Sequence, residues 1–138
     1  MSKLSELSLE NENIMKEALV KSGLDHVINV RFLGDDRQKL IHRFQKANNI
    51  AKFETNNDVY VIINELIFDQ LEELQKIMVA EESLAGLSFN YEKDKLETKK
   101  GDVNTFSGFL KKYGYDKYEV LTESIKTLYN VKQEEASV

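Results

Sequence analysis

The chain has 138 residues, of which 41% are hydrophobic and 31% are charged, and its formal net charge is −5 at pH 7. This composition is typical of one soluble globular domain, and a chain of this length buries roughly two thirds of the surface that its unfolded form exposes. The absence of cysteine excludes disulfides, thiolate metal sites and cysteine nucleophiles, and the acidic balance disfavours general nucleic-acid binding, which depends on Lys and Arg to neutralise phosphates.

The N-terminus carries no recognisable targeting signal. Residues 1–8 lack the apolar core of a secretory signal, and no stretch reaches the roughly 20 apolar residues of a membrane helix. We therefore expect a cytoplasmic protein. Because no proline marks an internal boundary, we predict a single globular domain over 8–130, with a flexible N-terminus at 1–7 and a flexible C-terminal tail at 131–138.

The first half of the chain predicts a helix, a strand and a second helix. Ser8 is placed to cap the first helix and Gly23 to end it, because apolar residues between them recur at spacings of three and four. The β-branched and aromatic residues of 27–33 predict a strand. A second helix is predicted because four apolar residues share one helical face, namely Leu40, Ile41, Phe44 and Ala47.

Two strands joined by a tight turn are predicted next. Apolar and polar residues alternate over 51–55, as in a half-exposed strand, and the residues at 56–58 tolerate the positive φ of a turn. The run at 59–64 predicts the returning strand. Its continuous apolar character predicts that both of its faces are covered.

A long helix, in one or two pieces, is predicted over 66–88 because its apolar residues form a stripe. Glu81 projects close to this stripe, and Glu82 lies beside it. Burying an unpaired carboxylate costs several kcal/mol or forces it to take up a proton. Glu81 is therefore expected to lie in a cleft, to have a partner, or to be exposed by rotation of the helix.

The rest of the chain predicts a hairpin and two helices. Strands over 87–91 and 95–99 flank an exposed turn, and Asn104 is placed to cap a short helix whose aromatic residues are more typical of a core than of a partner-binding stripe. Asp116 is placed to cap the last helix. Together these elements predict an α+β fold with a short, mostly antiparallel sheet packed with about five helices.

Chemical motifs are few. His26 and His42 are sixteen residues apart and form no ligand motif, so we expect each to have a surface or structural role. Ser83 is expected to be a helix-surface serine rather than a nucleophile. Acidic residues are interleaved with the lysines of 93–117, which predicts a solvated face of mixed charge rather than a basic patch. No calcium loop, glycine-rich phosphate loop or nucleophile elbow occurs.

The order of elements over 57–115, including the segment 102–114, resembles the bacteriophage metallopeptidases, a family of small zincin-like proteins. In H-E-x-x-H enzymes a helix binds zinc through two histidines and uses the glutamate to activate water. Laid on this family, Glu82 takes the place of the first histidine, Ser83 that of the glutamate and Gly86 that of the second histidine. The resemblance implies a zincin-like scaffold and a phage origin, while all three chemical residues differ.

We therefore predict a catalytically inactive, zincin-like phage protein that has no metal and no cofactor and that binds another protein, either a host factor or a component of host defence. No nucleic-acid or membrane partner is expected, and the oligomeric state stays open. The candidate binding cleft comprises Glu81, Glu82, Asp102, Phe106, Phe109 and Tyr113. One alternative is a hydrolase whose metal is held by carboxylates such as Glu81, Glu82 and Asp102. A second alternative is a virion or assembly component.

Overall fold

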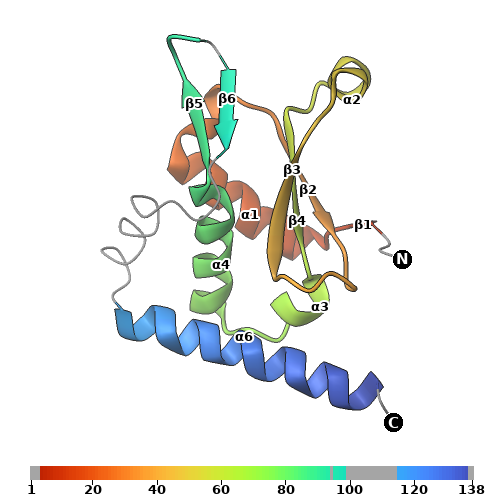
Figure 1. The fold of residues 1–138 in the computed structure, drawn as a ribbon. Coiled ribbons are helices and arrows are strands. Elements are labelled where there is room, and N and C mark those ends of the chain that lie inside the picture. The colour runs from red at the N-terminus through yellow and green to blue at the C-terminus, as the bar shows by residue number, and fades with distance from the viewer. Residues whose placement is uncertain (1–3, 94, 99–114, 137–138) are drawn as a thin grey trace.

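The computed structural model describes residues 4–93, 95–98 and 115–136, and Figure 1 shows their arrangement. Within these residues the fold is α+β. Five α-helices and one 3₁₀ helix, η1 (Leu24–His26), accompany a four-stranded sheet and a separate two-stranded sheet. The predicted fold class is confirmed, and the zincin-like assignment stays a prediction.

The main sheet has two parallel strands in its centre and an antiparallel strand at each edge. Its strands lie in the order β1 (Ser5–Glu6), β2 (Val30–Gly34), β4 (Val59–Ile63) and β3 (His42–Lys46). The second sheet is the predicted hairpin, formed by β5 (Leu87–Asn90) and β6 (Lys95–Thr98). Among the described strands most pairings are thus antiparallel, as predicted.

Helices α1 (Leu9–Ser22) and α4 (Glu73–Ala85) pack against each other beside the main sheet (Figure 1). The first begins where the Ser8 side chain accepts a hydrogen bond from a backbone N–H, and it ends at Gly23, whose φ of 78° is left-handed. Both boundaries agree with the prediction. Met15 of α1 is fully buried in one cluster with residues of α4 and the strands, which places the core between helices and sheet.

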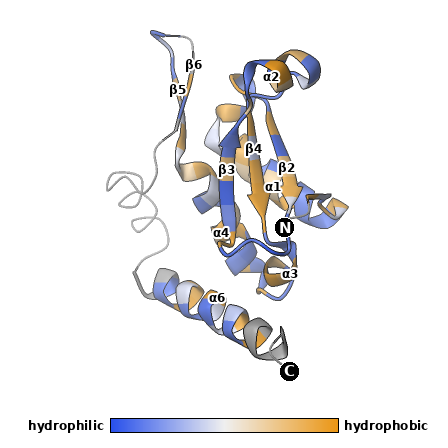
Figure 2. Cartoon of the chain, turned by 45° about the vertical axis from the view of Figure 1, so that its right-hand side comes forward, coloured by the Kyte–Doolittle hydropathy of each residue, from blue (hydrophilic) through white to orange (hydrophobic). Residues whose placement is uncertain are grey.

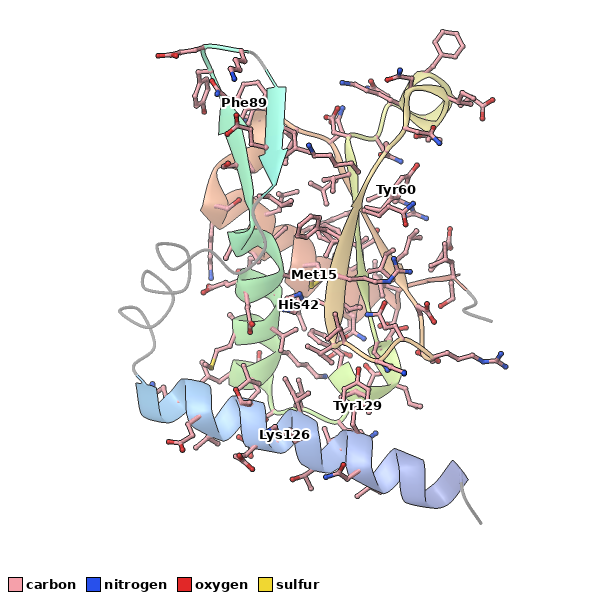
Figure 3. The ribbon with its side chains drawn as sticks, viewed as in Figure 1. Met15, His42, Tyr60, Phe89, Lys126 and Tyr129 are labelled. Atoms are coloured by element: carbon pink, nitrogen blue, oxygen red, sulfur yellow. The ribbon has the colours of Figure 1, made fainter. Side chains whose placement is uncertain are left out.

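Strand β4 is buried at the centre of the sheet, and Figure 2 shows it as a hydrophobic band beside a more hydrophilic β3. Val59, Val61 and Ile63 are inaccessible to solvent in the core cluster, and Ile62, which points to the opposite face, is only 2% exposed. The prediction that both faces are covered is confirmed for these residues. Tyr60 is partly exposed and points away from α4 (Figure 3).

The second predicted helix is wrong, because its residues form the edge strand β3. The backbone N–H of Asn64 donates to the Ile41 carbonyl at 2.9 Å, and that of Ala47 donates to the Asp58 carbonyl at 3.0 Å, so the segment bonds to the β4 region at both ends. A buried strand needs partners for the backbone groups on both of its edges, and this requirement outweighs the helical spacing of a few apolar residues. Leu40, one of those residues, is 65% exposed.

The strand predicted over 51–55 is also wrong, because these residues belong to a helix, α2 (Asn49–Thr55). The Asn48 side chain caps this helix by accepting a hydrogen bond from the backbone N–H of Ala51 at 2.8 Å, and Asn56 ends it with a φ of 61°. The asparagine-rich segment does contain a positive φ, as predicted. That residue ends a helix, so α2 takes the place of a tight turn between β3 and β4.

Two further predictions are refined. The long helix predicted over 66–88 is divided into α3 (Glu65–Phe68) and α4, which is one of its two predicted forms. The first predicted strand begins later, at Val30, because η1 precedes it. The predicted short aromatic helix lies outside the described residues.

Helix α6 (Tyr115–Ala136) runs below α3 and α4 in Figure 1. Leu121 anchors it with 1% exposure, and Ile125 and Leu128 pack against the core cluster. The helix continues to Ala136, within the predicted tail at 131–138. No helix among the described residues combines the length and the apolar character needed to cross a bilayer.

Candidate functional site

The three positions that the resemblance aligns with the H-E-x-x-H motif lie at the C-terminal end of α4. Glu82 and Ser83 are inside the helix, and Gly86 follows its last residue, where the chain turns directly into β5. Neighbouring side chains on a helix diverge by about 100°. Glu82 and Ser83 therefore face different surroundings.

Glu82 faces the edge strand β3. Its Oε1 lies 3.6 Å from Nε2 of His42, and the two side chains are 30% and 23% exposed. Figure 3 shows His42 between the strand and α4. The contact is an ion pair whenever the imidazole is protonated. His42 thus has a structural contact, as we expected. It lies on strand β3, however, and not on the predicted helix.

Ser83 faces the core and is 3% exposed. Its Oγ donates a hydrogen bond to the Ala80 carbonyl at 2.6 Å, within α4 itself. The expectation of a surface serine is wrong, because this position belongs to the buried stripe that also contains Val79 and Leu84. The expectation that Ser83 is not a nucleophile agrees with a hydroxyl that is engaged inside its own helix.

Glu81 is partly buried and lines a cavity of about 200 Å³ between α1 and α4, together with Lys21. It therefore lies in a cleft, one of the three arrangements expected. This cleft is on the side of α1, whereas Glu82 faces β3, so the structure does not bring the two carboxylates together. The other predicted binding residues lie outside the described residues, namely Asp102, Phe106, Phe109 and Tyr113.

The family model described as "Putative phage metallopeptidase" matches residues 8–130. The chain belongs to this phage metallopeptidase family. No curated protein and no solved structure shows significant similarity to the chain. The family match extends from the cap of α1 into the second half of α6, and it covers more of the chain than the segment 57–115 that carries the resemblance in the sequence.

Membership of the phage metallopeptidase family raises the question of whether the motif positions fit zinc, which takes three or four nitrogen, sulfur or oxygen ligands in proteins. Helix α4 offers the carboxylate of Glu82 in the first ligand position and no side chain from Gly86 in the second, and the Ser83 hydroxyl is turned to its own helix. In the described part of the chain, no three His, Asp or Glu side chains gather closely enough to hold a metal ion. These residues do not fit an H-E-x-x-H zinc centre.

A feature that sequence reasoning missed is the outer edge of β3, beside Glu82. Backbone groups of Ile41 and Ala47 bond toward β4, and alternate residues of an antiparallel strand direct these groups to opposite sides. His42, Phe44 and Lys46 therefore direct their N–H and C=O groups away from β4. No other strand among the described residues pairs with this edge. The alternation of Phe44 with polar neighbours was the available signal for this strand.

A groove of about 430 Å³ continues this edge between α2 and the β5–β6 hairpin. Lys46 and Lys52 line it on one side, and Phe89 and Leu96 of the hairpin line it on the other. Lys52 is paired, because its Nζ lies 3.1 Å from Oδ1 of Asp58, whereas Lys46 has no ion pair with the rest of the described chain. We call the outer edge of β3 and this groove together the β3 edge surface.

A polar cluster joins α6 to the end of β4. The Oδ1 of the fully buried Asn64 accepts a hydrogen bond from the backbone N–H of Ile67, and its Nδ2 donates to the Tyr129 hydroxyl at 3.2 Å. That hydroxyl donates to the Gln38 carbonyl at 3.4 Å. Burial raises the pKa of Tyr129, while the hydrogen bond from Asn64 lowers it by a smaller amount. The cluster holds α6 in place, so we assign it a structural role.

Proposed function

We propose that this chain is a family member without peptidase chemistry that works by binding another protein of the host cell, either a host factor or a component of host defence. The observation that carries the proposal is the state of Ser83, at the place of the catalytic glutamate. Its buried hydroxyl donates to Ala80 inside α4. A hydroxyl held in this way is not placed to act as the general base that H-E-x-x-H hydrolysis needs.

The β3 edge surface supports a binding role beside these motif positions. The outward N–H and C=O groups of His42, Phe44 and Lys46 form the hydrogen-bonding pattern to which an extended segment of another protein adds as a further strand. Such pairing supplies affinity through the main chain. The side chains along the same edge then determine which segment binds.

The groove next to Lys46 indicates the chemistry of that segment. Phe89 and Leu96 offer an apolar wall, and Lys46 offers a cation that no other described residue pairs. An extended segment that carries an apolar residue beside an acidic residue matches both features. We therefore expect the partner to present a strand of this composition.

A proline at position 46 tests the edge, because the Lys46 N–H points away from β4. Lys46→Pro removes this donor without removing a hydrogen bond of the β3–β4 ladder. Lys46→Gln is the matched control, because it removes the charge and keeps the N–H. In affinity capture from host cells followed by mass spectrometry, we expect a protein that the wild type retains to be lost with Lys46→Pro and retained more weakly with Lys46→Gln.

Several outcomes would contradict this proposal. Capture of nothing above background by the wild type removes the binding role, and equal capture by a folded Lys46→Pro variant removes the β3 edge. Stoichiometric zinc or manganese in protein purified without chelator, lost in Glu82→Ala, replaces the proposal with a carboxylate-ligated metal hydrolase. Self-association of the purified chain in light scattering, without a host partner, favours a virion or assembly component.

A further inference from the structure

A second and larger groove, of about 940 Å³, lies where the start of α4 faces the N-terminal half of α6. None of its described lining residues belongs to the β3 edge surface. Gln75 of α4 spans its two walls, because its Nε2 donates to Oγ of Ser124 in α6 at 3.1 Å. The groove therefore lies between two helices that are joined by this hydrogen bond and by the core beneath them.

Part of the groove lining is apolar. Leu71, before α4, is 6% exposed, and Leu128 of α6 is partly buried against the core cluster. Val120 belongs to the same lining and is 60% exposed. A ligand that covers Val120 and touches the two leucines would remove apolar surface from water, which is favourable.

Among the described residues, the charged side chains that line the groove are all acidic. Glu72 comes from the start of α4, and Glu119 and Glu123 come from α6, where they lie one turn apart. Carboxylates at this spacing on a helix repel each other. Lys76, the nearest lysine on α4, has its Nζ over the Phe68 ring at 5.8 Å and does not line the groove. Cations brought by a ligand would relieve this repulsion.

We infer that this groove, which we call the α4–α6 groove, binds a basic amphipathic segment of a partner protein. The apolar side chains of this segment contact Leu71, Val120 and Leu128. Its Lys or Arg side chains pair with the carboxylates of Glu72, Glu119 and Glu123. Electrostatic complementarity of this kind speeds association and selects against acidic segments. The inference goes beyond the proposed function, because the two surfaces have no residue in common and each is tested by its own variants.

The test uses the full chain and a fluorescein-labelled probe peptide in which Leu and Lys recur at helical spacing, with binding followed by fluorescence anisotropy. Two control peptides replace every Lys by Glu or every Leu by Ser. We expect the Leu/Lys peptide to bind and both controls to bind at least about tenfold more weakly, equivalent to about 1.4 kcal/mol. Binding of the Leu/Lys peptide is also expected to weaken as salt is added.

Charge-reversal variants test whether the Leu/Lys peptide binds in the α4–α6 groove. We expect Glu119→Lys plus Glu123→Lys to weaken binding of the Leu/Lys peptide at least about tenfold. The matched control is Glu10→Lys plus Glu17→Lys, which changes the net charge equally at two exposed positions of α1. We expect this control to stay within about twofold of the wild type, because its charges lie outside the groove.

The inference is overturned if both double variants weaken binding equally, because bulk charge then accounts for it. It is also overturned if the groove variant binds like the wild type, or if the Leu/Glu peptide binds as tightly as the Leu/Lys peptide. Circular dichroism and thermal melting verify that each variant is folded. Folding is expected in every case, since all four substituted side chains are exposed.

Discussion

The surroundings of Ser83 differ from those that the general base of an H-E-x-x-H helix requires. The side chain lies in the buried stripe of α4, and its hydroxyl is satisfied by the Ala80 carbonyl. In an H-E-x-x-H helix the residue at this place carries a charge and faces the water that it activates. Because Ser83 faces the core, introducing the three residues of the H-E-x-x-H motif would not by itself create that arrangement.

Substitutions of Ser83 test whether this position can hold a charged side chain. We expect Ser83→Glu to lower the free energy of unfolding by about 2 to 4 kcal/mol, because it buries an unpaired carboxylate. Ser83→Ala, the matched control, is expected to lower it by about 1 kcal/mol or less, because it removes a single hydrogen bond. Urea denaturation at neutral pH measures both values. A Ser83→Glu protein as stable as the wild type would show that the position reaches solvent and would reopen the peptidase interpretation.

Among the elements, those with local signals were predictable from the sequence. Helix α1 lies between Ser8 and Gly23, and both act on their immediate neighbours, so its ends follow from the residue types alone. Strand β3 was not predictable in the same way, because its extended form depends on hydrogen bonds to β4, which comes later in the chain. Asn48 suits the exit of one helix and the cap of the next equally well, and only the position of β3 decides between them.

The candidate site likewise combines local features, which the sequence shows, with long-range contacts, which it does not show. The departures from the motif that the resemblance implies at Glu82, Ser83 and Gly86 can be seen in the sequence, because the motif is contiguous. The contact between Glu82 and His42 is not, because it joins two distant segments whose approach is set by the packing of α4 beside β3. The outward backbone groups of β3 follow only from the register of its pairing with β4, which no local pattern specifies.

The attachment of α6 to β4 makes a prediction about pH. Burial raises the pKa of Tyr129 above its ordinary value of 10.0, so the folded protein keeps this proton at pH values where the unfolded chain loses it. The stability that this group contributes is complete below pH 10.0 and is lost as the pH rises through the raised pKa. Removing the hydroxyl should remove this dependence.

We therefore expect Tyr129→Phe to be less stable than the wild type by about 1 kcal/mol at neutral pH, because the buried Asn64 amide loses an acceptor. At pH values above 10.0, the variant should lose stability less steeply than the wild type. Urea denaturation of both proteins on either side of this pH measures the two slopes. Parallel slopes would mean that the Tyr129 hydroxyl titrates alike in the folded and unfolded chains.

At the scale of the whole molecule, one hydrophobic core joins α1, the main sheet, α4 and α6. Leu121 of α6 belongs to the same cluster as Met15 of α1 and Val61 of β4, and Ile125 and Leu128 pack against that cluster. Burial of one large aliphatic side chain contributes about 1.5 to 3 kcal/mol. Several such side chains amount to a large share of the roughly 5 to 15 kcal/mol by which domains are stable. We therefore propose that helix α6 is part of the folding unit.

Two truncations test this conclusion. We expect the chain 1–114, which lacks all of α6, to lose its cooperative urea transition or to unfold at a much lower urea concentration, because the surface under Leu121 becomes exposed. The chain 1–130 is the matched control, because it keeps the three side chains that contact the core, and we expect its free energy of unfolding to change by about 1 kcal/mol or less. If 1–114 instead unfolded cooperatively at the wild-type midpoint, the folding unit would end before α6, and the α4–α6 groove would need to be tested as a contact between separate parts.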